Sequence, residues 1–170
     1  KTHTIIEKIL EISKNMMSYQ GVIAISFTRK SSQELELRYQ KRKTENTNHF
    51  FGTIDKFYIS EIIMPFSRIF CGEKISFEIK HSLKDCSKYQ KLNELKNKIN
   101  EELIDLLKES MREGLIFLEI CGETALCILR EVPQSLLYLK ARYTHVFIDE
   151  YQDCGEVQHQ IFLELVNQGI

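Results

Sequence analysis

Val146-Phe147-Ile148-Asp149-Glu150-Tyr151-Gln152-Asp153 is the stretch that decides the fold of this 170-residue chain. Its first three residues are apolar and β-prone, which is typical of a strand buried on both faces of a parallel sheet. Polar groups collect beyond the carboxyl ends of such strands, so we expect Asp149 and Glu150 at that edge. Consecutive strand residues point to opposite sides, which predicts that one carboxylate holds Mg²⁺ and the other faces a water molecule. The alternative is a strand followed by an acidic first helical turn, which complements the helix dipole.

A second apolar run, residues 22–27, predicts another buried strand, and a polar segment follows it as well. This segment reads Thr28-Arg29-Lys30-Ser31-Ser32. Hydroxyl side chains are preferred at helix N-caps, so Ser31 or Ser32 is expected to cap a helix over residues 33–43.

Residues 50–53 predict a third strand, which ends at a glycine and a threonine. A helix over residues 54–70 should follow, with a kink or break at Pro65 because proline lacks the backbone donor. The chain itself opens with Lys1-Thr2 directly before a strongly apolar helix over residues 5–17, which is expected to be largely buried. Lys-Thr before a helix is a weak signal alone, although phosphate loops of the form GxxxxGK(S/T) end in this way.

The middle of the chain is predicted to be helical. Residues 88–113 show leucines and isoleucines at helical spacing, which predicts one long amphipathic helix ending at Gly114. Two shorter helices are expected over residues 123–130 and 134–141, around Pro133. We expect a helical subdomain inserted into an α/β core, with the core in residues 1–70, the insertion in residues 71–139 and the core continued in residues 140–170.

Composition is that of a soluble globular protein, with 43% hydrophobic and 28% charged residues. No apolar run reaches the about 18 residues that a membrane helix needs, so no membrane partner is expected. The odd number of cysteines, five, without a CxxC pair favours reduced thiols and a cytoplasmic location. Because the net charge is −1, any binding of nucleic acid must come from local basic patches.

The polar segments, taken in order, resemble the motifs of a known family. They read KT, SFTRKSS, GTIDKF and IDEYQD. This order resembles the first RecA-like domain of superfamily 1 DNA helicases of the UvrD/Rep type, whose motifs are GKT, TFTNKAA-like, GT(I/F)HxF-like and, after a helical insertion, the Walker B motif DE(F/Y/A)QD. The chain departs from these motifs at Arg29, where the family usually has Asn, at Ser31-Ser32 in place of Ala-Ala, and at Asp55 in place of His. The resemblance implies a RecA-like P-loop NTPase fold, a parallel sheet with a helical inserted subdomain.

The resemblance also implies roles for single residues. Lys1 and Thr2 would bind ATP, and Thr2 and Asp149 would hold Mg²⁺. Glu150 would be the base that activates water, and Lys1 and Gln152 would also act in catalysis. The implied contacts to single-stranded DNA are Phe27, Thr28, Arg29, Lys30, Thr53, Ile54, Lys56 and Phe57. Alternatives remain open: Gln152 and Asp153 can cap the next helix, and Phe27 and Phe57 can be core residues.

The function implied is that of an ATP-dependent DNA helicase or translocase that moves along single-stranded DNA, in the 3′-to-5′ direction, and accepts DNA with a single-stranded tail. Half of the phosphate loop and the second RecA-like domain would lie outside the chain, so the chain alone is expected to be inactive as an ATP hydrolase. Within the family, Ser60-Glu61-Ile62-Ile63 and Pro65-Phe66 resemble the helicase subunit of the Gabija anti-phage system. That likeness implies the alternative of an ATP- and DNA-sensing module that regulates a partner nuclease.

Overall fold

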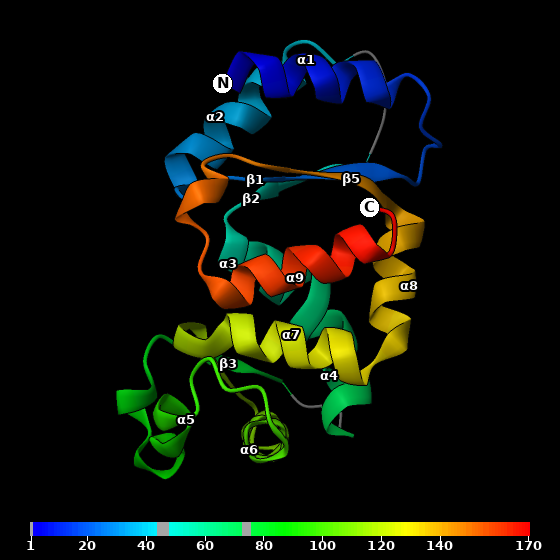
Figure 1. Cartoon of the computed structure of the whole chain (residues 1–170). Coiled ribbons are helices and arrows are strands. Elements are labelled where there is room, and N and C mark those ends of the chain that lie inside the picture. Colours follow the sequence, from blue (N-terminus) through cyan, green and yellow to red (C-terminus); the bar gives the residue numbers. More distant parts are fainter. Residues whose placement is uncertain (1, 44–47, 73–75) are drawn as a thin grey trace.

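The computed structural model describes residues 2–43, 48–72 and 76–170, and a three-stranded parallel sheet lies at its centre (Figure 1). The strands lie in the order β2-β1-β5 and comprise β1 (Gly21–Ile25), β2 (Phe50–Gly52) and β5 (Tyr143–Ile148). Ile25 of β1 pairs with Gly52 of β2 and with Ile148 of β5. The three predicted strands therefore form, and they end level with one another.

Two helices, α1 (Thr2–Ser13) and α2 (Arg29–Gln40), cover the upper face of the sheet in Figure 1. Their apolar side chains and those of the upper sheet face form a small core: Ile6, Ile9, Val22, Ala24, Leu35, Tyr39 and Phe51. The expectation that the first helix is largely buried is wrong. Ile6 and Ile9 are buried, but Ile5 and Ile12 are partly exposed, because α1 is an outer-layer helix with one covered side.

A larger core lies below the sheet. The residues after β2 form one continuous helical rod made of α3 (Ile54–Phe57), a π-helical part that we call the π segment (Tyr58–Ile63), and α4 (Met64–Cys71). The other helices of this layer are α7 (Cys121–Glu131), α8 (Pro133–Arg142) and α9 (Glu156–Asn167). Ile23 and Ile25 of β1 pack into the same core as these helices, so sheet and helices share one hydrophobic interior.

The region farthest from the sheet, at the bottom of Figure 1, is less helical than expected. Its described residues form a parallel pair of short strands, β3 (Glu78–Lys80) and β4 (Leu115–Phe117), and the helices α5 (Lys91–Glu94) and α6 (Glu101–Arg112). They also form three 3₁₀ turns, at Leu83–Asp85, Ser87–Tyr89 and Leu118–Ile120. The predicted helix over residues 88–113 is thus wrong as a single element.

Asparagines explain that break. Asn97 has a φ of 62°, in the left-handed region that Asn tolerates better than most residues, and Asn100 caps α6 by accepting a hydrogen bond from the Leu103 N–H at 2.9 Å. Gly114, with a φ of 79°, follows the end of α6 as predicted.

Two predicted helix boundaries also need correction. The N-cap of α2 is Thr28, whose hydroxyl accepts a hydrogen bond from the Ser31 N–H at 3.1 Å, so neither Ser31 nor Ser32 caps it. Pro65 does not break its helix. The irregularity precedes it as the π segment, which continues directly into α4. Proline removes one backbone donor there, and the wider π turn accommodates that loss without a break in the rod.

The two parallel neighbours β1 and β5 differ in burial. Every residue of β1 is buried, whereas in β5 only Tyr143 is buried, and His145 is exposed. The expectation of a strand buried on both faces holds for β1 and is wrong for β5, because β5 lies at the edge of the described sheet.

Candidate functional site

Three polar loops meet at the carboxyl edge of the sheet, where β1, β2 and β5 end. Two backbone hydrogen bonds continue the strand pairing past this edge: the Asp149 N–H donates to the Ile25 carbonyl at 2.9 Å, and the Ser26 N–H donates to the Gly52 carbonyl at 3.1 Å. Helix α1 also begins on this side of the molecule (Figure 1). The acidic stretch therefore lies next to the segment that follows β1, and that segment lies next to the one that follows β2, as expected of parallel strands.

The two carboxylates lie in a turn rather than in the strand. Because β5 ends at Ile148, the strand alternation that predicted opposite directions for Asp149 and Glu150 does not apply to them. Glu150 has a φ of 58° and a ψ of 44°, a left-handed conformation that costs a residue with a Cβ roughly 1–2 kcal/mol. Its carboxylate accepts a hydrogen bond from the Gln152 side-chain amide. Such strain persists where the surrounding structure holds it in place, and it clusters at active sites.

The residues after the acidic turn are not the cap of the next helix. Helix α9 has Gly155 at its N-cap, and the Gly155 N–H donates to the Gln158 side chain, so neither Gln152 nor Asp153 fills that position. Both side chains are exposed beside the turn. Burial and the neighbouring Asp153 raise the pKa of the Cys154 thiol, which therefore stays protonated at neutral pH.

Positive charge collects after β1. Thr28 caps α2, and Arg29 and Lys30 are exposed in its first turn. Cations at this end of a helix oppose the helix dipole, so they add to the positive potential of the unpaired N–H groups. Phosphate groups bind readily to such a helix start.

The segment after β2 is held more tightly. Thr53 caps α3 by accepting a hydrogen bond from the Lys56 N–H at 3.4 Å. The Lys56 ammonium group donates to the Phe51 carbonyl at 3.2 Å and lies 5.6 Å from the centre of the Phe50 ring. Asp55 accepts a contact from the Cys121 thiol of α7 at 3.5 Å, which ties this loop to the lower layer.

Two residues predicted to contact DNA are core residues in this structure. Phe57 is fully buried, with its ring centre 5.4 Å from that of Phe50, and Ile54 is 6% exposed. Phe57 therefore has no exposed face on which a base could stack, which corrects that part of the prediction. Phe27 is partly exposed and remains available for stacking.

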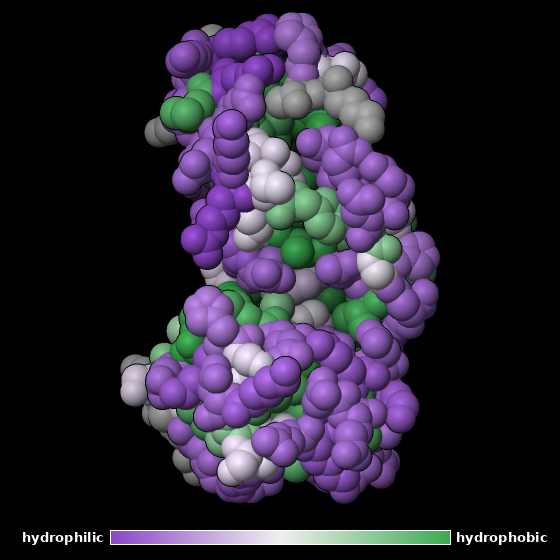
Figure 2. Space-filling model, turned by 90° about the vertical axis from the view of Figure 1, so that its left-hand side faces the viewer, coloured by the Kyte–Doolittle hydropathy of each residue, from purple (hydrophilic) through white to green (hydrophobic). Residues whose placement is uncertain are grey.

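A cavity of about 750 Å³ lies between the loop after β1 and the loop after β2. Its lining includes Phe27 and Arg29 from the first loop and Thr53, Ile54 and Lys56 from the second. Lys30, by contrast, lines a separate pocket on the outer side of α2. Figure 2, which looks onto the carboxyl edge, shows apolar residues in a recess between hydrophilic margins.

The opposite wall of this cavity was missed by sequence reasoning. Ile79, His81 and Leu118 line it, and they come from the β3–β4 region. Ile79 is 44% exposed despite being apolar. Nothing in the local sequence marks these residues, because only the tertiary fold brings β3 and β4 opposite the Thr53 loop.

Two predicted ATP-binding positions cannot be placed. Lys1 lies outside the described residues, as does the side chain of Thr2, although the backbone of Thr2 begins α1. In the described part of the chain, no helix is long and apolar enough to cross a membrane.

Comparison with known proteins identifies the family. The family model of the UvrD/REP helicase N-terminal domain matches residues 73–170. The chain is 30% identical over 184 aligned positions to Gabija protein GajB of Bacillus cereus (strain VD045), an alignment that covers 99% of the chain and 32% of that relative. It is 39% identical over 61 positions to ATP-dependent DNA helicase UvrD1 of Mycobacterium bovis, covering 34% of the chain and 8% of that protein. UvrD1 of Mycobacterium leprae is 39% identical over 56 positions, which cover 33% of the chain and 7% of the relative.

The chain thus spans about a third of the length of the Gabija relative and less than a tenth of the UvrD1 proteins. The family match covers the β3–β4 region, the acidic turn and α9, and the Gabija alignment extends the similarity to the loops after β1 and β2. With three motif loops at one edge of a parallel sheet and a family match over more than half of its residues, the chain belongs to the UvrD/REP helicase N-terminal domain family.

Proposed function

We propose that the complete protein containing this chain is an ATP-dependent DNA helicase or translocase that moves along single-stranded DNA. The observation that carries this proposal is the convergence of the acidic turn with the loops after β1 and β2 at one sheet edge. A motor needs its ATP site and its DNA site on elements that share a rigid body, and adjacent parallel strands supply such a body.

On the ATP side, the donor set fits a nucleotide with Mg²⁺. Asp149 is a partly exposed carboxylate at the strand end, and with Thr2 it would hold Mg²⁺, which neutralises phosphate charge when bound. Lys1 would bind the phosphates. Glu150, held in its unusual backbone conformation, would accept a proton from the attacking water, and Gln152, hydrogen-bonded to Glu150, would orient that carboxylate.

On the DNA side, the cavity below the loops is the proposed strand site. Arg29, at the start of α2, and Thr53 and Lys56, at the start of α3, would contact phosphates in this cavity. Thr28 and Lys30 are outside the cavity lining and would contact phosphates beside it, at the start of α2. Phe27, which lines the cavity and is partly exposed, is the proposed stacking platform for a base.

The proposal is tested with the purified complete protein. ATP hydrolysis should rise several-fold when single-stranded DNA is added, and duplexes with a 3′ single-stranded tail should be unwound in preference to those with a 5′ tail. Absence of any DNA-stimulated hydrolysis would contradict the motor function, whereas preference for the 5′ tail would contradict only the proposed 3′-to-5′ direction.

A second candidate function rests on the alignment with Gabija protein GajB, which covers nearly the whole chain. In this alternative, the protein senses ATP and DNA and regulates a partner nuclease in anti-phage defence. It would bind ATP and DNA without unwinding the DNA. A nuclease subunit would co-purify with it, and the activity of that nuclease would change when ATP is added. DNA unwinding by the isolated protein would favour the motor instead.

A further inference from the structure

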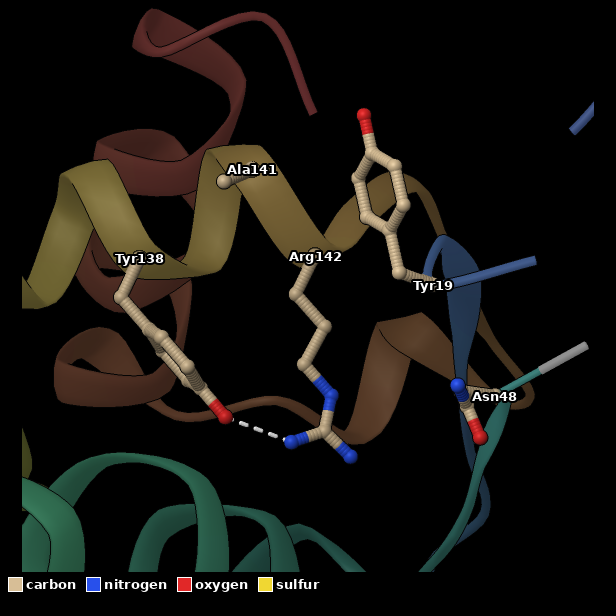
Figure 3. A pocket seen from close by; sticks show the side chains of 5 residues that line it. All are labelled: Tyr19, Asn48, Tyr138, Ala141 and Arg142. Atoms are coloured by element: carbon tan, nitrogen blue, oxygen red, sulfur yellow. Dashed lines mark hydrogen bonds between the residues drawn. The ribbon is translucent and has the colours of Figure 1, made fainter. Parts of the chain in front are cut away.

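A polar network lies below the sheet at the opposite, amino end of β5. Its centre is Glu61, in the π segment, which is only 8% exposed. The Tyr143 hydroxyl donates to the Glu61 carboxylate at 2.7 Å, and the Arg142 guanidinium lies 3.4 Å from the same oxygen. Arg142 also donates to the Tyr138 hydroxyl at 2.5 Å, as Figure 3 shows. The network thus joins the helical rod after β2 to the junction of α8 and β5.

Burial makes this network costly to break. A buried carboxylate is tolerated only when charge and hydrogen bonds compensate it. Glu61 has both, with a third contact from the Ser60 hydroxyl at 3.2 Å. Burial and the hydrogen bond to Glu61 raise the pKa of Tyr143, so its hydroxyl stays protonated and remains the donor. The Arg142 guanidinium lies over the rings of Tyr143 and Tyr138, at 5.2 and 5.9 Å from their centres.

Arg142 and Tyr138 are the members of the network that solvent can reach. With Tyr19, Asn48 and Ala141 they line a cavity of about 410 Å³ (Figure 3). Glu61 and Tyr143 lie behind them, at 8% and 1% exposure. The link between the rod and β5 is therefore an interior contact. A surface ion pair would contribute little to stability.

The network links two elements that do not pair in the sheet. β2, which leads into the rod, and β5, which leads into the acidic turn, are separated by β1. The rod begins at Thr53 and α3, where the proposed DNA contacts lie, and Glu61 follows α3 by one helical turn. Tyr143 is the first residue of the strand that ends before Asp149. The Glu61–Tyr143 hydrogen bond thus connects the proposed DNA-binding helix with the strand that carries the proposed catalytic carboxylates.

We propose that Glu61 is a positioning residue that holds the helical rod against β5. Through this contact, binding of DNA at Thr53 and Lys56 is coupled to the positions of Asp149 and Glu150. This inference rests on the proposed motor function. It predicts that loss of the Glu61–Tyr143 bond lowers the stimulation of hydrolysis by DNA, while hydrolysis without DNA stays within about twofold of the wild type. Networks of this kind change coupling between sites by roughly two- to thirtyfold.

The experiment compares Glu61→Gln, Tyr143→Phe and the double variant in the complete protein, with and without a saturating single-stranded oligonucleotide. Both single variants should lose roughly two- to thirtyfold in DNA stimulation, because Glu61→Gln removes the charge of the acceptor and Tyr143→Phe removes the donor of the same bond. The double variant should therefore lose no more than the worse single one. Tyr58→Phe is the matched control. Its hydroxyl lies buried in the same π segment and has no hydrogen-bond partner among the described residues, so stimulation should be unchanged.

Amide hydrogen exchange supplies a readout that does not depend on ATP hydrolysis. In Tyr143→Phe, the amides of α3 should exchange roughly tenfold faster or more, with α2 unaffected, because a hydrogen bond to a charged group is lost. Should Glu61→Gln fail to fold, the milder Tyr143→Phe carries the test. A wild type without DNA-stimulated hydrolysis would contradict the motor function, and hydrogen exchange would then decide on Glu61 alone. Unchanged α3 exchange in Tyr143→Phe would overturn the positioning role.

Discussion

Polar side chains lie at both ends of the strands of the central sheet, at the amino edge and at the carboxyl edge. The two ends differ in whether these side chains find hydrogen-bond partners within the protein or face solvent. At the amino edge, before β2, the His49 ring accepts a hydrogen bond from the Val22 N–H at 2.9 Å through Nδ1. Its Nε2 lies 3.0 Å from the Ser13 hydroxyl and 2.8 Å from the Tyr39 hydroxyl. One side chain thereby joins α1, β1 and α2 to the start of β2.

At the carboxyl edge, the polar groups face outward. Asp149 and Glu150 are partly exposed, Gln152 and Asp153 are exposed, and Glu150 adopts a backbone conformation that is unfavourable for it. In a parallel sheet, the satisfaction of polar groups thus distinguishes the functional end of the strands from the structural end. Polar groups that are satisfied within the protein stabilise the fold, whereas polar groups that are held in strained turns and left open to solvent are available to ligands.

The sharpest test of this contrast, with the largest expected effect, concerns the carboxyl edge. Glu150→Gln in the complete protein should lower DNA-stimulated turnover roughly 10²- to 10⁴-fold, or about 3–5 kcal/mol of activation free energy, since a positioned general base is lost. Nucleotide affinity should remain nearly normal. Steady-state hydrolysis and equilibrium binding of a fluorescent ATP analogue measure the two quantities.

Asp149→Asn serves as the companion variant. It should weaken Mg-nucleotide binding as well as turnover, because a metal carboxylate is removed. Neither variant should lower the free energy of unfolding by much, since both residues are partly exposed. Full turnover in Glu150→Gln would show that Glu150 is not the catalytic base, and full turnover in both variants would show that the acidic turn is only a strand end and a helix start.

The amino edge should respond to pH instead. Burial, with a smaller effect of Lys43, lowers the pKa of His49 to about 4, whereas the unfolded chain has the ordinary value of 6.5. Between these values the unfolded state binds a proton that the folded state does not, so stability rises with pH. The contribution is fully present above pH 6.5 and is lost as pH falls through 4, a loss of at most about 3 kcal/mol. Urea unfolding at pH 7 and pH 4.5 measures it.

His49→Gln should flatten this pH dependence and lower stability at pH 7, because the hydrogen bonds across three elements are disturbed. His81→Gln is the matched control, since His81 is exposed. A pH dependence between 4.5 and 7 that survives unchanged in His49→Gln would mean that the amino edge is not the source of the acid sensitivity.

The smallest expected effect tests the strain at the carboxyl edge. Glu150→Gly should raise the free energy of unfolding by about 1 kcal/mol, because glycine adopts the left-handed conformation without the clash of a Cβ, while turnover is lost. Asn97→Gly, at the other non-glycine residue with positive φ among those described, should give a smaller gain and leave turnover intact. Denaturant unfolding of both variants compares them, and a destabilised Glu150→Gly would refute the strain.

The parts of the fold that sequence reasoning predicted are those with a strong local pattern. The apolar runs before Thr28, Thr53 and Asp149 identified the three strands, and the polar residues after them identified the carboxyl edge. The break between α5 and α6 was missed because leucine spacing outweighed the asparagines at positions 97 and 100. Hydrophobic periodicity reports which side of a helix is buried, but it does not report where the helix is interrupted.

The candidate site was predictable to the same extent. The place of Asp149 and of the loops after β1 and β2 at the carboxyl edge could be predicted from the order of the motifs. The left-handed turn at Glu150 could not, because a glutamate does not indicate a positive φ. The cavity wall from Ile79, His81 and Leu118 depends on tertiary packing between segments far apart in the chain. The burial of Phe57 likewise depends on tertiary packing, in the core that it shares with Phe50.

The π segment has a consequence for how sequences of such proteins are compared. Each residue of an α-helix advances the side-chain direction by about 100°, so a relative whose rod is α-helical throughout would need a different number of residues to keep both ends in phase. Here the start of the rod is fixed by Thr53 and its far end by Phe66 and Phe70 in the core. An alignment drawn without a gap through residues 58–63 would therefore match core positions with surface positions on one side of that segment.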